Sequence, residues 1–156
     1  HRRRDALLSH SLRPFERSLP MALMRARETV MREFRPRLAL HDLTEQQWRV
    51  LRALNGQDTP VTTRQLSEMT FLLSPSLSRI TANLAARGLL IREANPSDQR
   101  SSLLSLSPDA EEVLSLMAVD SEAGYSAIEQ SFGSDRLELL YNLLDDLAAT
   151  RTAKGT

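Results

Sequence analysis

The run from Ser74 to Leu106 constrains the fold more than any other part of this chain. It predicts a helix with Ser74 as N-cap and Pro75 in its first turn, followed by two short strands joined by a polar turn. Gly88 is suited to end the helix in the left-handed conformation. The helix has an apolar stripe at helical spacing: Leu77, Ile80 and Leu84. A helix followed by a hairpin in this order indicates a winged helix-turn-helix.

The opposite face of this helix carries short polar side chains and arginines, which suits contact with base edges and phosphates. In a winged helix the hairpin reaches along the DNA backbone toward the minor groove. We predict that Arg100 enters the minor groove and that Asp98 orients its guanidinium through a charge-assisted pair; a surface ion pair of little consequence is the alternative. The candidate DNA-binding residues are Ser74, Ser76, Ser78, Arg79, Asn83, Arg87, Asp98 and Arg100.

The remaining elements are predicted to be mainly helical. An amphipathic helix covers residues 19–40, and Pro36 is expected to kink or end it. Thr44 and Gln47 form a capping box at the start of the next helix. A short edge strand at residues 60–62 and a helix capped by Thr63 complete the helix-turn-helix. A further helix is predicted to start at Ser107 and Pro108, and Ser134 is predicted to cap the last helix.

These helices leave more apolar face than one small winged lobe can bury, so we predict a homodimer. The helices at 19–40 and 108–150 form the dimer interface, and the winged-helix lobe covers 44–107, within a single domain of residues 19–156. Residues 1–18 are rich in arginine and are predicted to be a flexible basic arm, with or without a role in binding. The predicted fold class is mainly α with a small β wing.

Charge and residue counts limit the classes of function that this chain can have. The formal net charge is zero, but arginines dominate before Ser107 and acidic residues after it, so one face can be basic. The alternative is that these charges only form the ordinary solvated surface of the helices. The chain has no cysteine, and its three histidines are scattered along the sequence. We therefore expect that the protein is not an enzyme and that it has no metal site or cofactor. Without a membrane-length apolar run or a signal-peptide pattern, we expect a soluble cytoplasmic protein.

Several residues could hold an organic anion. Arg27 lies between Met24 and Met31 on the first helix, where a cation and pliable thioethers meet. Trp48, the single tryptophan, precedes Arg49 on the second helix, and His41 lies just before it. Each of these residues also has a purely structural interpretation. Arg27 can extend its charge to solvent from a half-buried helix, Trp48 can be a core residue, and His41 can lie in a surface loop.

The segment LSPSLSRITANLAARGLLIREANPSDQRSSLLSLSPDAEEVL resembles the recognition helix, wing and following helix of MarR-family transcription regulators. Asp98-Gln99-Arg100 matches the wing pattern; Ser107 stands where the family often has Thr, and the usual nearby Gly is absent. The segments SLPMALMRARETVMREFRP and LTEQQWRVLRAL resemble the branch that controls homoprotocatechuate and related aromatic-acid catabolism.

The resemblance implies a homodimeric transcription regulator that binds a pseudo-palindromic operator in double-stranded DNA and is released, as a repressor, by a small aromatic acid. The ligand would lie between the dimerisation helices and the DNA-binding lobe. Six residues are the candidates to line its pocket: Met24, Arg27, Met31, His41, Trp48 and Arg49. Two alternatives stay open, a DNA-binding protein without an effector and a winged-helix module that binds protein.

Overall fold

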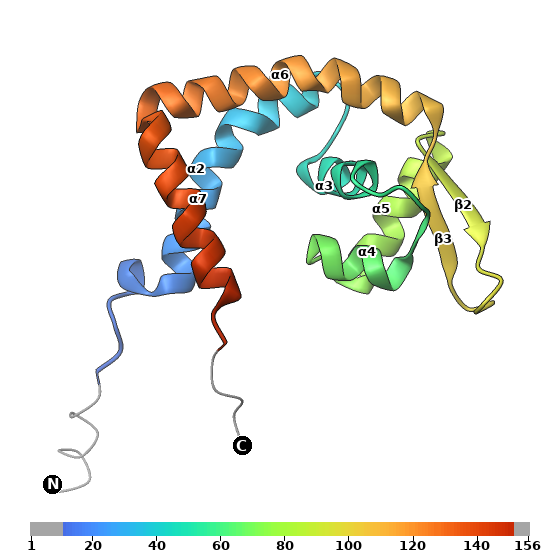
Figure 1. Cartoon of the computed structure of the whole chain (residues 1–156), viewed down its shortest axis with the longest axis horizontal. Helices are drawn as coiled ribbons and strands as arrows, with labels where there is room; N and C mark the ends of the chain where they lie inside the picture. Colours follow the sequence, from blue (N-terminus) through green and yellow to red (C-terminus); the bar gives the residue numbers. More distant parts are fainter. Residues whose placement is uncertain (1–10, 152–156) are drawn as a thin grey trace, which may run out of the picture. The chain divides into compact units, whose positions relative to one another are not determined.

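The computed structural model describes residues 11–151 of the 156-residue chain (Figure 1). Its elements are η1 (Phe15–Arg17), α2 (Leu19–Ala39), α3 (Glu45–Asn55), β1 (Val61–Thr62), α4 (Thr63–Thr70), α5 (Ser74–Ala86), β2 (Leu90–Ala94), β3 (Ser102–Leu106), α6 (Pro108–Phe132) and α7 (Ser134–Ala149). The chain divides into two compact units, residues 1–32 and 33–156, and each is described by itself. In residues 11–151 no helix has the length and apolarity needed to cross a membrane.

The first unit contains η1 and the start of α2. Arg25 Nη2 donates a 2.8 Å hydrogen bond to the carbonyl of Glu16, which ties the 3₁₀ turn to the helix. Residues 1–10 of the predicted basic arm lie outside the described residues. The expectation that Pro36 ends the helix is wrong, because α2 continues through Pro36 to Ala39. Proline removes only one helical donor, the one that would bond the carbonyl of Arg32.

Capping explains where the next helices begin. The predicted capping box at the start of α3 is confirmed: the Gln47 N–H donates to Thr44 Oγ1, and the Gln47 amide oxygen accepts from the Thr44 N–H. The predicted cap of α4 is wrong by one residue, since Thr62 caps this helix and Thr63 is its first residue. Thr62 lies three residues before Gln65, which is the spacing that the second capping box requires.

Two other predicted caps are also one residue late. Ser74 and Ser134 are the first residues of α5 and α7, and Leu73 and Gly133 occupy the cap positions without side-chain hydrogen bonds. Helix boundaries shift this easily when the capping side chain makes no bond that fixes them. The predicted cap at Ser107 is confirmed, with its Oγ accepting from the Ala110 N–H at 3.2 Å.

The end of α5 leads directly into the wing. Gly88 adopts a left-handed φ of 74°, as its position predicts, and its N–H donates to the carbonyl of Ala85 at 3.0 Å. The Leu89 N–H donates to the carbonyl of Leu84 at 2.9 Å, completing a Schellman motif. The Ser107 hydroxyl donates to the Gly88 carbonyl at 2.6 Å, so the start of α6 is held against the end of α5.

The sheet is antiparallel, with strand order β1-β3-β2. Leu104 in the middle of β3 pairs with Val61 on one side and Arg92 on the other, and only 1% of Leu104 is exposed. In β2 only Leu90 is buried, so most of the β2–β3 hairpin extends beyond the core. This arrangement confirms the predicted edge strand and the wing.

The core lies in the second unit, where apolar faces of α3–α6 and the sheet meet. Its residues are Leu38, Leu43, Val50, Leu51, Leu54, Val61, Leu66, Leu72, Leu77, Leu84, Leu89, Leu90, Leu104, Ala110, Leu114 and Met117. Further along α6, Gly124 is buried against Phe34 at the end of α2, whose ring also contacts Tyr125 edge-on at 5.0 Å. α7, in contrast, has no buried residue, although it carries five leucines in its last eleven residues.

Candidate DNA interface and ligand cleft

The first two turns of α5 present a polar face to solvent. Ser78 and Arg79 are exposed and Ser76 is partly exposed, while Leu77 and Thr81 on the other side are buried. Within residues 11–151, the guanidinium of Arg79 has no hydrogen-bond or ion-pair partner. This part of the helix therefore has the free donors and acceptors that contact with base edges and phosphates requires.

The second half of α5 is held by the start of α3 instead. The Gln47 amide donates to Asn83 Oδ1 at 2.9 Å, and Arg87 Nη1 donates to the carbonyl of Asp42 at 2.8 Å. Asn83 and Arg87 were predicted to contact DNA, but the structure gives both of them intramolecular partners. Their contacts fix the recognition helix on α3.

The tip of the wing is built by local hydrogen bonds. Asn95 Oδ1 accepts from the Ser97 N–H and Asp98 Oδ1 accepts from the Arg100 N–H, at 3.0 and 2.9 Å. Asp98 therefore orients the backbone of Arg100, and the described residues contain no ion pair between the Asp98 carboxylate and the Arg100 guanidinium. The predicted charge-assisted pair is wrong, because a carboxylate two residues before an N–H closes an Asx turn more readily. Arg100 is exposed and its guanidinium is available.

Arg92 joins the wing to the recognition helix. Its Nη2 donates to Thr81 Oγ1 at 3.1 Å, and the same hydroxyl donates to the carbonyl of Leu77 within α5. Arg92 is not among the candidate residues named from the sequence. Its bond to Thr81 depends on how the strand packs on the helix, which no local pattern indicates.

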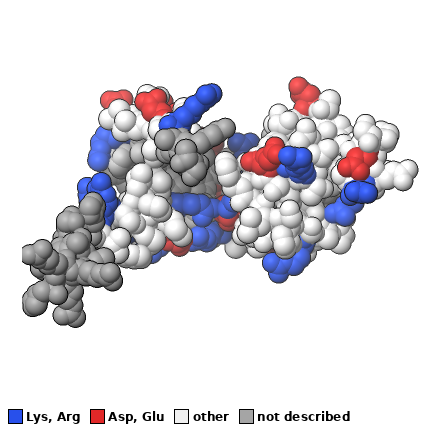
Figure 2. All heavy atoms as spheres, turned by 90° about the horizontal axis from the view of Figure 1, so that it is seen from below, with Lys and Arg blue, Asp and Glu red and all other residues white. Residues whose placement is uncertain are grey.

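Charge is balanced over the lobe that carries these elements. Between residues 41 and 107 there are seven arginines and six acidic residues. The face in Figure 2 shows separate small groups of basic and acidic side chains on a mostly neutral surface. Any attraction for phosphate must therefore come from individual arginines such as Arg79 and Arg100, rather than from the net charge.

A cleft of about 460 Å³ lies between α3 and α6. This volume is in the range of small-molecule sites. Its lining combines two aromatic rings, one cation, two carboxylates and short polar or apolar groups: Trp48, Arg52, Asn55, Glu111, Leu114, Ser115, Ala118, Ser121, Glu122 and Tyr125. The guanidinium of Arg52 and the indole N–H of Trp48 have no hydrogen-bond partner in residues 11–151. The Tyr125 ring is held by its contact with Phe34.

Partial burial, helped by the nearby Tyr125, Glu138 and Glu129, raises the pKa of Tyr141 on α7 above its usual range. The Tyr141 hydroxyl, like that of an ordinary tyrosine, is neutral near pH 7 and can donate a hydrogen bond.

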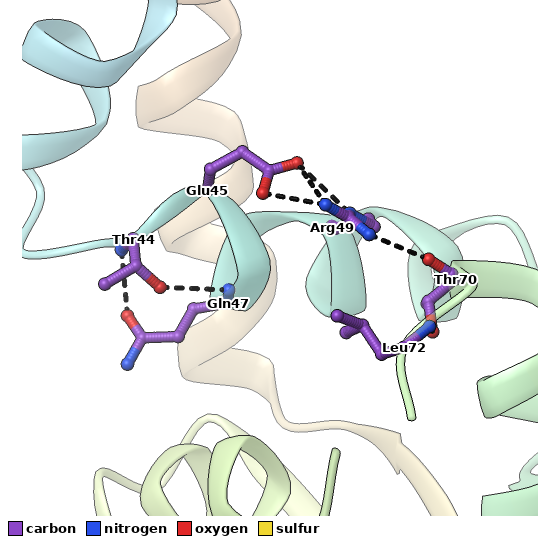
Figure 3. Close-up of polar contacts among 6 residues, drawn as sticks. All are labelled: Thr44, Glu45, Gln47, Arg49, Thr70 and Leu72. Carbon is purple, nitrogen blue, oxygen red and sulfur yellow. Dashed lines mark hydrogen bonds and ion pairs between the residues drawn. The ribbon is translucent and has the colours of Figure 1, made fainter. Parts of the chain in front are cut away.

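The structure places Trp48 on the cleft but puts Arg49 and His41 elsewhere. Arg49 lies on another face of α3, where its guanidinium binds the Glu45 carboxylate and the carbonyl of Thr70 (Figure 3). His41 Nε2 lies 2.7 Å from Asp120 Oδ2 and joins the α2–α3 turn to α6. Met24, Arg27 and Met31 lie in the first unit, and their role stays a prediction.

Of the residues that line the cleft, only Trp48 was predicted from the sequence, and Arg52 is the cation that the prediction missed. It follows Trp48 by four residues, and residues four apart share one face of a helix. Arg49 is adjacent to Trp48 in sequence, but one step along a helix turns the side chain by about 100°. The helical spacing was the signal that could have identified Arg52.

A sequence profile of the MarR family matches residues 41–101. The chain is also 34% identical over 136 residues to the HTH-type transcriptional regulator FarR of Neisseria gonorrhoeae, an alignment that covers 87% of this chain and 92% of FarR. The chain belongs to the MarR family. The resemblance noted in its recognition helix and wing is thereby confirmed.

Two further MarR-family proteins are similar over most of their length. The homoprotocatechuate degradative operon repressor of Escherichia coli is 33% identical over 132 residues, which cover 85% of this chain and 88% of the repressor. The crystal structure of NadR in complex with 4-hydroxyphenylacetate superposes with a TM-score of 0.73 at 32% identity, covering 91% of this chain and all of that one. These relatives are regulators of transcription rather than enzymes, and the NadR superposition confirms the winged-helix fold.

Proposed function

We propose that this MarR-family chain acts in the cytoplasm as a homodimeric repressor that binds operator DNA and releases it when a small aromatic carboxylic acid binds. The observation that carries the DNA-binding part is the pairing of two exposed elements with free arginines. These are the first turns of α5 with Arg79 and the preformed wing tip with Arg100. A recognition helix and a wing with these groups can engage the major groove and the neighbouring backbone at once.

The exposed apolar face of α7 supports the dimer. Leu139 and Leu143 are 57% and 56% exposed, and Leu140, Leu144 and Leu147 are also exposed. Such a face is unfavourable in water, and a second copy of the chain offers a matching one. Two copies present two recognition helices, which predicts an operator with two half-sites related by symmetry.

The cleft between α3 and α6 supports the effector. Arg52 offers a free cation for a carboxylate, and Trp48 and Tyr125 offer aromatic surface for a ring. The NadR complex contains 4-hydroxyphenylacetate, and the similar Escherichia coli protein is named for repression of homoprotocatechuate degradation. A ligand lowers DNA affinity only if it binds better to the state that cannot bind DNA.

The DNA-binding proposal is tested with a duplex that the wild-type protein selects from a random pool. We expect Arg79→Ala and Arg100→Ala each to lower affinity for it at least tenfold in fluorescence anisotropy. A variant that has lost a phosphate contact should also show a weaker dependence of DNA affinity on salt concentration than the wild type. Arg151→Ala, which removes the same charge after α7, is the control and should keep wild-type affinity. Selection of no duplex, or variants equal to the control, would contradict the proposal.

The effector proposal is tested by calorimetry with 4-hydroxyphenylacetate. Arg52→Ala should weaken binding at least tenfold, because it removes the cation that is free to pair with the carboxylate. Arg64→Ala, which removes an exposed arginine of α4, is a matched control that should bind normally. Absence of binding by 4-hydroxyphenylacetate, hydroxycinnamate and indole-3-acetate to the wild type would favour a regulator without an aromatic effector.

A further inference from the structure

All three nitrogens of the Arg49 guanidinium bind protein groups. Its Nε and Nη2 bind the Glu45 carboxylate, with both Nη2 distances at 2.8 Å, and its Nη1 donates to the carbonyl of Thr70 at 2.9 Å (Figure 3). Glu45 precedes Arg49 by one helical turn, and both side chains are largely shielded from water. A planar guanidinium can hold a carboxylate on one edge and a carbonyl on another without rearranging.

The carbonyl of Thr70 is at a critical point of the helix-turn-helix. Thr70 is the last residue of α4, so its carbonyl has no partner within that helix. The next residue, Phe71, has a left-handed φ of 58°, which is costly for a residue with a Cβ and persists only where the surroundings enforce it. Arg49 supplies a cation and a donor to this helix end, where both are favourable.

Other contacts leave the turn little freedom. The Ser67 hydroxyl donates to the carbonyl of Leu72 at 2.7 Å, and the Leu72 side chain is in the core. The carbonyl of Leu73 then accepts the first hydrogen bond of α5, from the Leu77 N–H. The direction of the recognition helix is thus set within three residues of the group that Arg49 holds.

α3 is joined to both ends of the recognition helix. Arg49 holds the turn before α5, and Gln47 binds Asn83 near the end of α5. Another face of α3 carries Trp48 and Arg52 in the cleft. A change in the position of α3 therefore reaches the recognition helix through side-chain contacts at two points.

From this geometry we infer that Arg49 is a positioning residue for operator recognition: it fixes the recognition helix through the Thr70 carbonyl and contacts neither DNA nor effector. The inference rests on the proposed function as a DNA-binding repressor. It predicts that a change at Arg49 alters affinity for the operator but not general attraction to DNA. It also predicts no change in effector affinity, since Arg49 does not line the cleft.

The test compares Arg49→Lys with Arg64→Lys on two DNAs, the selected duplex and poly(dI-dC). Lysine keeps the charge, but a single ammonium does not reproduce the fork that spans Glu45 and the Thr70 carbonyl. We expect Arg49→Lys to lose at least tenfold affinity for the selected duplex and less than twofold for poly(dI-dC). Arg64, which forms an exposed pair with Glu68 at the same helical spacing, is the control and should lose neither.

Melting curves and calorimetry with 4-hydroxyphenylacetate accompany this comparison. An Arg49→Lys protein that melts earlier but keeps the wild-type ratio of the two DNA affinities would show a purely structural role and overturn the inference. A tenfold loss of effector affinity would overturn it as well, by placing Arg49 in the ligand site.

If Arg49→Lys does not fold, Glu45→Gln gives the same test, because the amide keeps the shape but weakens the bidentate pair. The same loss of operator preference is expected, and an unchanged ratio contradicts the inference. Failure of the wild type to select any duplex contradicts the proposed function instead, so the two failures are distinguishable.

Discussion

Replacing Gly124 with alanine tests the packing that places Tyr125 at the cleft. A Cβ at this position would lie 2.7 Å from Cε1 and 3.1 Å from Cδ1 of the Phe34 ring. Carbon atoms in contact normally lie about 3.5–4.0 Å apart, so the ring must move by roughly 1 Å. The obstacle is a partly buried aromatic ring that itself contacts Tyr125, so it cannot yield freely.

The expected size of the effect follows from opposing contributions. Alanine in place of glycine favours the helix by about 1 kcal/mol. Overpacking costs about 1–3 kcal/mol, and loss of the Phe34–Tyr125 contact costs about 0.5–1.5 kcal/mol. Together these contributions give a net loss of about 0.5–3.5 kcal/mol for Gly124→Ala, centred near about 2 kcal/mol. This loss corresponds to a Tm lower by roughly 1–14 °C for a chain of this size.

The assay is thermal unfolding followed by circular dichroism at one fixed protein concentration, since the Tm of a dimer depends on concentration. Ser126→Ala, at an exposed site two residues along α6, is the control and should melt at or slightly above the wild type. Phe34→Leu in the Gly124→Ala background should restore part of the lost stability. A Gly124→Ala protein that melts at or above the wild-type temperature would show that the Phe34 ring yields to the new methyl group without cost.

Three further predictions concern function and capping. Trp48 is the single tryptophan, so 4-hydroxyphenylacetate should change the intrinsic fluorescence with the same Kd that calorimetry gives; binding without a spectral change would place the ligand away from the cleft. Ser107→Ala removes both the cap of α6 and the bond to the Gly88 carbonyl, and should cost about 1–2 kcal/mol in denaturant unfolding, whereas an unchanged midpoint would show that neither bond contributes. The Arg49→Lys protein should release the selected duplex less completely than the wild type when ligand is added. The measure is the ratio of operator affinities with and without ligand, and a wild-type ratio would show that α3 does not transmit ligand binding to the recognition helix.

The order of elements was predictable because it depends on local patterns. Apolar spacing marked the recognition helix, and Gly88 marked its end, since few other residues adopt the left-handed conformation there. The cap at Thr44 was predictable because Gln47 completes its capping box. Two adjacent threonines, Thr62 and Thr63, could cap α4. Only Thr62 lies three residues before Gln65, and this spacing identifies it as the cap.

The candidate site was less predictable because it depends on which helix faces meet. Trp48 was predicted to line a pocket, and it does line the cleft. Arg52, which lines the same cleft, could be identified only from the way α3 faces α6. Arg49 was assigned to the ligand because it is a cation next to an aromatic residue. Its actual partners are the Glu45 carboxylate one helical turn earlier and a carbonyl 21 residues away, and no local pattern indicates the second contact.

Operator binding and its release by an aromatic acid can be followed in a single titration. The affinity of the wild-type protein for its selected duplex is measured by anisotropy at constant salt while 4-hydroxyphenylacetate is added. We expect operator affinity to fall and level off as the ligand saturates the cleft, and Arg52→Ala to need far more ligand for the same effect. Operator affinity that stays constant up to ligand concentrations that saturate the protein would exclude this acid as the signal that releases the DNA.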